Sequence, residues 1–355
     1  MDVVVLAVAF IVILAGAELF TNGIEWFGRK LNLAQGAVGS VLAAVGTALP
    51  ETMIPIIAIV FGGGSEESNH VGVGAILGAP FMLSTLAMFV TGLGVIAWRD
   101  RRASGTRMVV DTTVLVHDIR YFIIAYALAI ATAFVPPEIS WVRWAVAVVL
   151  IGIYAYYVKG HFDAEAEEHG EDDDLAPLRF RRMDPPGHRV DPVVPRLRVV
   201  NLQVLVALGC IIGGAYLFVG AVERLALTLG ISEILLALVI APIATELPEK
   251  FNSLIWVRQG KDTLAMGNIT GAMVFQSAIP TVVALILAGE AWHVDDDTLI
   301  AFLSAAIAFI AVGAIFGPMW RRGRLDGRAL LVGGALYVVY LVLVGAAIAG
   351  LLPIG

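Results

Sequence analysis

The chain has 355 residues, of which 59% are hydrophobic and only 15% are charged. A soluble globular domain carries about 25% charged residues, so this composition excludes an ordinary soluble protein and indicates a membrane protein. The formal net charge of −7 argues against a nucleic-acid partner. The single cysteine, Cys210, excludes a disulfide framework or a thiolate metal site, and its apolar surroundings predict a packing residue.

Apolar segments of about 20 residues are long enough to cross a bilayer as helices. An all-α fold with ten spans is predicted: 3–24, 34–61, 71–98, 117–135, 140–158, 199–222, 231–257, 263–288, 298–318 and 328–352. The first span lacks a basic n-region and a clear cleavage site, so we interpret it as a permanent helix and not a signal peptide.

The long polar segment 159–197 is interpreted as a cytoplasmic linker between two halves, 1–158 and 198–355. A regulatory cation-binding loop is the alternative, although the segment has no EF-hand spacing of ligands and glycine.

Basic residues are distributed unequally between the two sides of the predicted bundle. Alternate connections carry nineteen of the 23 Lys and Arg residues, whereas the connections 62–70, 135–140 and 289–297 carry none. The basic side is cytoplasmic by the positive-inside rule. We therefore expect a multi-pass protein of the plasma or inner membrane, with both termini on the non-cytoplasmic side. Lipid is the expected partner, and no obligatory protein partner is evident.

The two halves share landmarks in the same order. Four pairs of segments match: Leu49-Pro50-Glu51 with Leu247-Pro248-Glu249, Thr47 with Thr245, "GAELF" (16–20) with "GAYLF" (214–218), and "GAILGA" (74–79) with "GNITGA" (267–272). Because each half holds five spans, an odd number, the halves enter the membrane from opposite sides. This inverted repeat is typical of secondary transporters, whose substrate sites lie near the midplane on discontinuous helices.

The repeated Pro-Glu pairs predict a site in the membrane. Proline disrupts a helix, so the second and seventh helices are predicted to be broken, and the freed carbonyls can line a cavity. A carboxylate at that depth is costly unless it is paired or binds a cation, and hard oxygen ligands suit Ca²⁺. The expected cation ligands are Glu51, Glu249, Thr47 and Thr245. The alternative is that both glutamates are neutral and hydrogen-bonded, or only mark kinks.

These motifs resemble the calcium/cation antiporter superfamily, the sodium/calcium exchanger-like membrane proteins. Its two repeats carry G-T-S-L-P-E and then G-N-x-x-G-S-N; this chain reads "GTALPE" (46–51), "GAILGAP" (74–80), "ATELPE" (244–249) and "GNITGAM" (267–273). The resemblance covers essentially the whole chain. It implies alternating-access exchange of a cation, usually Ca²⁺, against Na⁺ or H⁺. It also implies that Glu51 and Glu249 are the central ligands, with no cofactor besides the transported cation.

The departures from the superfamily pattern remove oxygen ligands that would hold several Na⁺ ions. Serines are replaced by Ala48, Glu246, Ala79 and Ala272, and the carboxamide or carboxylate positions become Leu83 and Gln276. The second half instead gains Glu246 and Lys250 beside Glu249. We hypothesise that Lys250 with Glu246 lowers the number of Na⁺ ions used and favours proton coupling; the alternative is that Lys250 snorkels to the headgroups. Gln276, Asn252 and Asn268 are expected to support the ligands.

Two further features carry structural predictions. Glu18 is expected to make a lateral or interfacial polar contact, because its repeat counterpart is Tyr216; the alternative is that it is a cation ligand. Glycines at four-residue spacing are expected to let helices approach closely beside the broken helices: Gly74, Gly78, Gly267 and Gly271.

The same sequence features distinguish between other possible functions. A Na⁺/H⁺ or other monovalent cation exchanger on the same fold fits the thinned ligand set. A cation channel is less favoured, because an inverted repeat with broken helices indicates alternating access. The chain has no H-E-x-x-H motif, nucleophile elbow or P-loop, so we expect a transporter driven by an ion gradient and not an enzyme.

Overall fold

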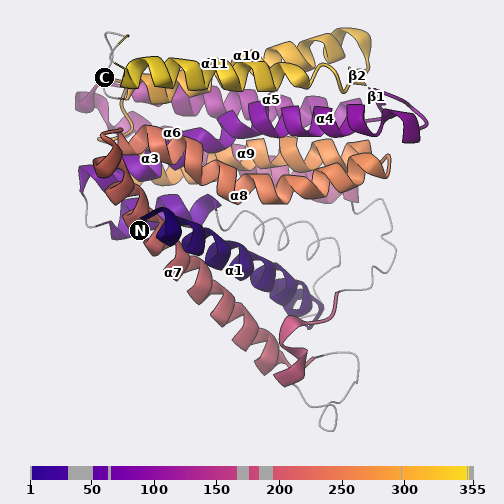
Figure 1. Cartoon of the computed structure of the whole chain (residues 1–355), viewed down its shortest axis with the longest axis horizontal. Coiled ribbons are helices and arrows are strands. Elements are labelled where there is room, and N and C mark those ends of the chain that lie inside the picture. Colours follow the sequence, from indigo (N-terminus) through magenta and orange to yellow (C-terminus); the bar gives the residue numbers. More distant parts are fainter. Residues whose placement is uncertain are drawn as a thin grey trace.

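The computed structural model is a bundle of long helices with two short strands (Figure 1). It describes residues 2–30, 51–62, 65–165, 176–183, 195–296, 298–349 and 351, without the side chains of 28–30, 137, 161–165, 244 and 246–252. The elements are α1 (Asp2–Lys30), η2 (Ile57–Phe61), α3 (Glu66–Met82), η3 (Leu83–Ala87), α4 (Met88–Ala97), β1 (Arg107–Met108), α5 (Thr112–Ala131), α6 (Trp141–Glu165), η7 (Arg179–Met183), α7 (Leu197–Leu229), α8 (Glu233–Arg258), α9 (Asp262–Leu287), α10 (Leu299–Arg322), β2 (Leu325–Asp326) and α11 (Leu331–Ile348). Short 3₁₀ turns complete the described connections: η4 (Arg99–Arg101), η5 (Thr132–Phe134) and η6 (Pro137–Ile139).

Eight of the ten predicted spans are confirmed in the described residues as helices long and apolar enough to cross a membrane. The other two predicted spans carry the Pro-Glu motifs. In the second, the helix Glu51–Phe61 is described, whereas Thr47 and the break predicted at Pro50 lie outside the described residues. The seventh corresponds to α8, whose backbone is helical through residue 248, so the predicted break does not interrupt it. A proline removes one backbone hydrogen bond, and the bonds on either side can continue the helix.

Prolines also precede the two distorted helical segments. The π-helical turns η2 and η3 begin two residues after Pro55 and three residues after Pro80. Because proline has no N–H to donate, the backbone around it accommodates a wider i→i+5 turn. Both π turns lie in the first half of the chain.

Local capping signals set several helix ends. The Ser65 hydroxyl accepts a hydrogen bond from Ser68 N at the start of α3, and Asp111 accepts from Thr113 N at the start of α5. Gly230 and Gly323 end α7 and α10 with positive φ angles of 64° and 62°. Only glycine takes this left-handed conformation without a steric penalty, so both helices stop there.

The helices pack in pairs that join the two halves of the chain. Helix α1 packs along α7, α3 packs on α8, and α5 and α6 pack on α9. On the other side of the bundle α10 packs on α3, and α11 packs on η3 and α4. Figure 1 shows α1 and α7 running side by side, inclined to the remaining helices. The two halves are therefore packed against each other through several helix pairs.

The α1–α7 crossing is reciprocal. A Cβ atom added at Gly16 of α1 would lie 2.9 Å from Ile211 Cγ1 and 3.0 Å from Ala207 O. One added at Gly214 of α7 would lie 2.6 Å from Ile13 Cγ1 and 3.2 Å from Ala9 O. Gly16, Ile13 and Ala9 become Gly214, Ile211 and Ala207 when 198 is added to each number. Cys210 also lies at this crossing, 3.0 Å from a Cβ at Gly16, as expected of a packing residue.

The predicted close approach through glycines is confirmed on α3. Gly74 lies against the backbone of Ile234 and Gly78 against that of Leu238, both on α8, where an added Cβ would overlap. Small residues at a helix interface allow such contact between backbones. Among the described residues, a Cβ at Gly267 meets nothing within 4 Å and one at Gly271 meets only Tyr157 Oη at 3.4 Å. The same packing is therefore not seen for α9.

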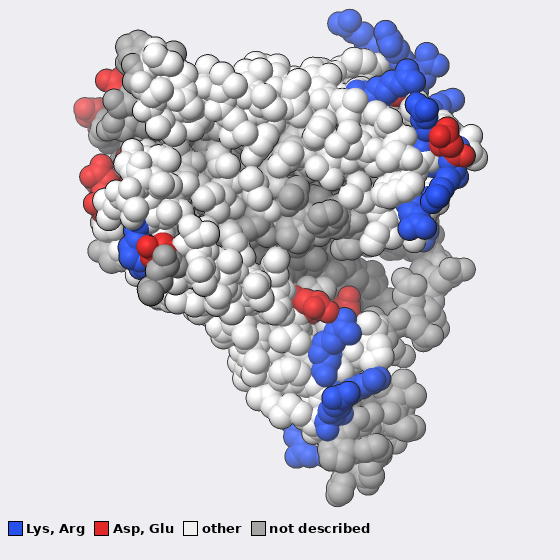
Figure 2. Space-filling view, in the orientation of Figure 1, with Lys and Arg blue, Asp and Glu red and all other residues white. Residues whose placement is uncertain are grey.

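One end of the bundle gathers the basic connections. The strand β1 pairs antiparallel with β2, which joins the α4–α5 connection to the α10–α11 connection. Arg102 binds Asp262 with two contacts, Nη1–Oδ1 at 2.8 Å and Nη2–Oδ2 at 2.6 Å, which ties the same end to the start of α9. Figure 2 shows Lys and Arg gathered at this end and around the lower ends of α1 and α7.

The opposite end is joined by polar contacts between other connections. Val294 N donates to Ala133 O at 3.2 Å, and the Arg143 guanidinium donates to Gly289 O. Trp292 is fully buried, and its indole N–H lies 3.2 Å from Ala129 O and 3.1 Å from Thr132 Oγ1. Alternate connections thus meet at opposite ends, as the predicted order of spans requires.

The described part of the predicted linker docks against α1 and α7. Residues 176–183 bring Leu178 into an apolar cluster with Trp26, Val199 and Val200. The Trp26 indole N–H donates to Ala176 O at 2.9 Å.

Two buried amides hold the same segment. Gln203 of α7 accepts from Phe180 N at 2.9 Å and donates to Leu19 O at 2.8 Å, and its Nε2 lies 3.1 Å from Asn22 Oδ1. The exposed Glu18 binds Arg179 at 2.7 Å, which confirms the polar contact expected of it.

Candidate functional site

Glu51 begins the described helix of the second span. Its side chain is only 7% exposed, although this helix consists mostly of apolar residues. The following residues Ile54, Ile57 and Ala58 are buried in an apolar cluster that also contains residues of α1, α3, α7 and α8. The helix also packs against α9 through η2. In a membrane protein, a carboxylate enclosed in this way is a candidate functional position.

The matching motif of the second half lies on α8. Thr245 is 2% exposed, and its hydroxyl donates to Ala241 O at 3.0 Å, one turn earlier in the same helix. The backbone of Glu246, Glu249, Lys250 and Asn252 belongs to α8, and their side chains lie outside the described part of the structure. The pairing of Glu51 with Glu249, like the role of Lys250, therefore stays a prediction.

Two of the residues expected to support the ligands, Gln276 and Asn268, lie on α9. Gln276 is 2% exposed. Asn268 Nδ2 lies 3.4 Å from Ser253 Oγ, and that hydroxyl lies 3.3 Å from Ala265 O. The Asn268–Ser253 contact connects α9 with the part of α8 that follows the Pro-Glu motif. Asn268 is thus positioned to hold these two helices together.

Three of the positions that depart from the superfamily pattern are buried: Ala79, Leu83 and Gln276. Leu83 is fully buried and Ala79 is 3% exposed, so in the first half these positions present only hydrocarbon to their surroundings. Gln276, the repeat counterpart of Leu83, keeps one carboxamide oxygen. The second half therefore offers more oxygen at these positions than the first.

Two buried serines were not predicted from the sequence motifs. Ser84 of η3 and Ser277 of α9 are 1% and 0% exposed, and they occupy equivalent positions at the offset of 193 that relates the second pair of motifs. Each hydroxyl donates to the carbonyl three residues earlier, Phe81 O at 3.0 Å and Val274 O at 2.9 Å. Extending the same offset beyond the glycine motifs would have found both.

A second buried carboxylate lies between α5, α6 and α9. Asp118 is 1% exposed; its Oδ1 accepts from Tyr157 Oη at 3.0 Å and its Oδ2 accepts from Thr270 Oγ1 at 2.6 Å. Tyr157 also stacks on the ring of His117, with 5.8 Å between centroids. Thr270 lies in the "GNITGA" segment of α9. The cluster therefore attaches α5 and α6 to the helix that carries Gln276 and Ser277.

The helices, the membrane-length apolar segments and the buried polar groups together define a multi-pass membrane protein with polar chemistry inside its bundle. The chain belongs to the sodium/calcium exchanger protein family, whose model matches residues 1–160 and 200–346. The resemblance drawn from the motifs is thereby confirmed, and the chain is a cation antiporter of the sodium/calcium exchanger family.

Similar proteins fit this assignment. The putative antiporter CaxA of Alkalimonas amylolytica is 24% identical over 335 residues, 92% of this chain and 93% of CaxA. The inner membrane protein YrbG of Escherichia coli (strain K12) is 36% identical over 116 residues, 31% of this chain and 33% of YrbG.

Solved structures share the fold at low identity. The H⁺/Ca²⁺ exchanger CAX matches with a TM-score of 0.70 and 17% identity, covering 99% of this chain and 85% of CAX. The sodium-calcium exchanger NCX_Mj matches with a TM-score of 0.55 and 17% identity, covering 96% of this chain and 98% of that one.

Proposed function

We propose that this protein is a secondary active antiporter that exchanges Ca²⁺ against H⁺ or Na⁺ by alternating access. The transported cation is held near the membrane midplane by Glu51 and Glu249, with Thr47 and Thr245 as further oxygen ligands. The observation that carries the proposal is the enclosure of Glu51, a residue that is 7% exposed at the start of an apolar helix. An ionised carboxylate at such a position requires a cation or another charge partner.

The packing supports an inverted repeat of halves 1–158 and 198–355. Gly16 and Gly214 meet each other's helices through residues related by the same offset of 198 that relates the two Pro-Glu motifs. The packing of α5 on α9 and of α10 on α3 likewise has the exchanged order expected of two related halves. A pseudo-two-fold relation of this kind brings Glu51 and Glu249 to the same depth from opposite sides.

The basic end of the molecule supports the proposed orientation. The connections around β1, β2 and Asp262 lie together, and they carry many of the basic residues. The positive-inside rule places this end in the cytoplasm of a plasma or inner membrane, with both termini on the other side and residues 159–197 as a cytoplasmic linker. The protein works within lipid, with small inorganic cations as its other partners, and needs no cofactor besides the transported cation.

Protons are the coupling ion that the ligand set favours. The buried Ala79 and Leu83 supply no side-chain oxygen where sodium-coupled relatives have ligands, so fewer Na⁺ ions can be held beside a divalent cation. Carboxylates that release Ca²⁺ can take up protons in its place. Lys250, paired with Glu246, adds a tethered positive charge that further reduces the need for Na⁺.

Flux in proteoliposomes tests the proposal. Ca²⁺ uptake is measured with an outward H⁺ gradient or an outward Na⁺ gradient, for the natural protein and for Glu51→Gln and Glu249→Gln. We expect the H⁺ gradient to drive uptake and each variant to lower it by about 100-fold, because removing one charge of a buried pair costs about 3 kcal/mol or more. Glu18→Gln is the matched control, since Glu18 is an exposed acid bound to Arg179, and it should retain full flux.

The same assay distinguishes the calcium antiporter from a second candidate, a monovalent cation exchanger. The absence of side-chain oxygens at Ala79 and Leu83 also favours this second candidate. If neither gradient moves Ca²⁺ while Na⁺ still exchanges for H⁺, the calcium proposal fails and the monovalent one stands. Lys250→Met belongs in the same series. An unchanged pH dependence of flux in that variant would remove Lys250 from proton coupling without affecting the assignment of the glutamates.

A further inference from the structure

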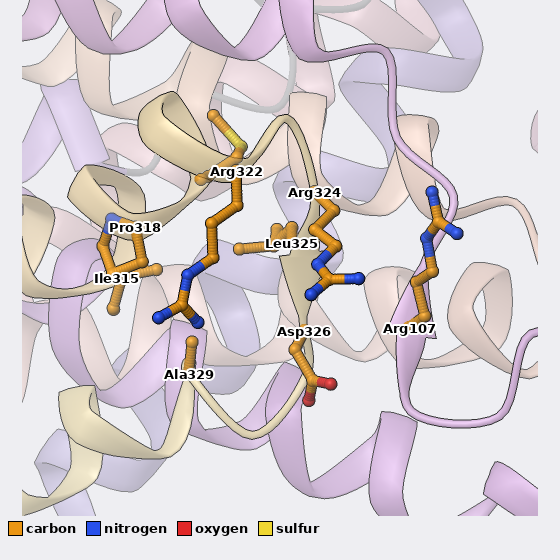
Figure 3. Close-up of a pocket in the computed structure, with 9 residues that line it drawn as sticks. Arg107, Ile315, Pro318, Arg322, Arg324, Leu325, Asp326 and Ala329 are labelled. Carbon is orange, nitrogen blue, oxygen red and sulfur yellow. The ribbon is translucent and has the colours of Figure 1, made fainter.

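A cavity of about 320 Å³ lies at the basic end of the bundle, where α10 ends and β2 begins (Figure 3). Its floor is apolar and consists of Ile315, Met319 and Leu325, each 1% exposed. Its rim carries the guanidinium-bearing side chains of Arg322 and Arg324. The cavity therefore combines a hydrocarbon floor with positive charge at its edge.

The positive charge of this rim exceeds its negative charge. Figure 3 shows the guanidinium groups of Arg322 and Arg324 on the side of Ala329 and Asp326, while that of Arg107 points away. Asp326 is the acidic residue of the lining, and its two oxygens accept from Thr106 Oγ1 at 3.3 Å and from Arg328 N at 2.9 Å. Within the described part of the chain, neither Arg322 nor Arg324 forms an ion pair with an acidic side chain.

A second cavity of about 490 Å³ continues from the first along α10. The two share Pro318 and Arg322, and the second is lined by Gly313, Ala314, Gly317 and Trp320. A Cβ added at Gly313 or Gly317 meets no described atom within 4 Å, so these glycines leave a shallow trough on the helix surface. The trough runs from the basic end into the apolar part of α10. Trp320 is 47% exposed, as expected of an aromatic residue at a membrane–water interface.

We propose that these joined cavities bind one anionic phospholipid. Arg322 and Arg324 bind the headgroup phosphate, because guanidinium groups match phosphate oxygens with paired hydrogen bonds. One acyl chain follows the trough past Gly317 and Gly313, which lie in a membrane-spanning helix and face outward. A phospholipid satisfies both parts of the site, whereas a free phosphate would leave the trough without a ligand.

The position of the site also suits lipid on physical grounds. Anionic headgroups attract basic residues at the membrane surface, and basic pockets between membrane helices are suited to phosphate-bearing headgroups. The carbonyl end of α10 carries partial negative charge, which Arg321 and Arg322 offset in its last turn. Arg324, which follows the terminating Gly323, adds charge beyond what the helix end requires.

The test measures lipid binding by the purified full chain, with native mass spectrometry in detergent as the readout. Phosphatidylglycerol, phosphatidylcholine with the same acyl chains, and inorganic phosphate are titrated separately. We expect phosphatidylglycerol to bind more tightly than phosphatidylcholine. The double variant Arg322→Gln/Arg324→Gln should weaken the binding of the first phosphatidylglycerol molecule by about 25-fold. Each arginine near an anionic headgroup contributes a factor of about five to the affinity.

Two matched controls separate a built site from diffuse charge. Arg99→Gln/Arg101→Gln removes the same charge from the same end outside both cavities, and it should weaken binding less than about threefold. Gly317→Leu fills the trough without changing the charge. It should weaken phosphatidylglycerol binding about tenfold, as expected from the loss of about two methylene contacts. Gly152→Leu, at an open glycine of α6, should have no effect.

Three results would overturn the proposal. Equal losses in the two double arginine variants would indicate diffuse attraction and no site. Inorganic phosphate that displaces phosphatidylglycerol at equal concentration, with no effect of Gly317→Leu, would indicate a site for free phosphate. Equal binding of phosphatidylcholine and phosphatidylglycerol would remove the role of the arginines. The melting temperature of each variant, measured without lipid, verifies that it is folded.

Discussion

The α1–α7 pair and the rest of the bundle differ in the polar contacts that hold them together. The pair meets through a crossing of small and apolar residues around Gly16 and Gly214, and its buried polar contacts are the neutral hydrogen bonds from Gln203 to Leu19 O and Asn22 Oδ1. The bundle of α3–α6 and α8–α11 is locked at its ends by polar contacts, including the buried Arg102–Asp262 pair and the fully buried Trp292.

The α1–α7 pair has few contacts with the rest of the bundle. Helices α1 and α7 contact the bundle through an apolar cluster around Leu6, Ile57 and Val222, and at the far end Trp26 and Val199 pack with the docked linker segment. The pair is thus bound more extensively to itself than to its neighbours.

The largest expected effect is at the buried ion pair of the bundle. Arg102→Met leaves the Asp262 carboxylate, 1% exposed, without its guanidinium partner, so we expect a loss of about 3–5 kcal/mol in the free energy of unfolding. Unfolding in mixed SDS micelles measures it. Arg179→Met breaks the exposed pair with Glu18 and should cost less than about 1 kcal/mol. Similar losses in both variants would contradict the distinction between the buried ion pair of the bundle and the exposed ion pair of the linker.

An intermediate effect is expected at the reciprocal crossing. Gly16→Ala and Gly214→Ala each force a Cβ into contacts of 3.0 Å or less, so each should destabilise the protein by about 1–3 kcal/mol, and by similar amounts. Gly209→Ala and Gly213→Ala, at open positions of α7, should be neutral or stabilising by up to about 1 kcal/mol. A cost at Gly16 with none at Gly214 would show that the crossing is not symmetric.

The smallest expected effect is at the linker contact. Gln203→Leu leaves the Phe180 N–H and the Leu19 carbonyl without their partner, so the docked segment should lose about 1–2 kcal/mol of binding to α1 and α7. Limited trypsin digestion should then cut faster after Arg181 and Arg182. Asn201→Leu, at an exposed position of α7, is the matched control and should leave the rate unchanged. Equal rates for both variants and the natural chain would show that Gln203 does not hold the linker.

Local properties of the chain explain which predictions succeeded. The apolar segments, the contact of Glu18 and the packing of Gly74 and Gly78 depend on residue type and spacing, which the sequence displays directly. The uninterrupted backbone of α8 through Pro248 was not predicted, because neighbouring hydrogen bonds decide whether a proline ends a helix or only bends it. Ser84 and Ser277 were missed because the repeat was not followed past its glycines.

The sequence by itself determined the membrane class, the order of the spans, the family and the repeated Pro-Glu motif. These properties depend on the length of apolar segments and on motif spacing, which are local features of the chain. Only the tertiary structure decided which distant residues meet: Arg102 with Asp262, Gln203 with the linker, and Arg322 with Arg324 above an apolar floor. The physical reason is that these contacts join segments separated by loops and whole helices. Their partners are selected by packing and charge in three dimensions and have no periodic signal in the sequence.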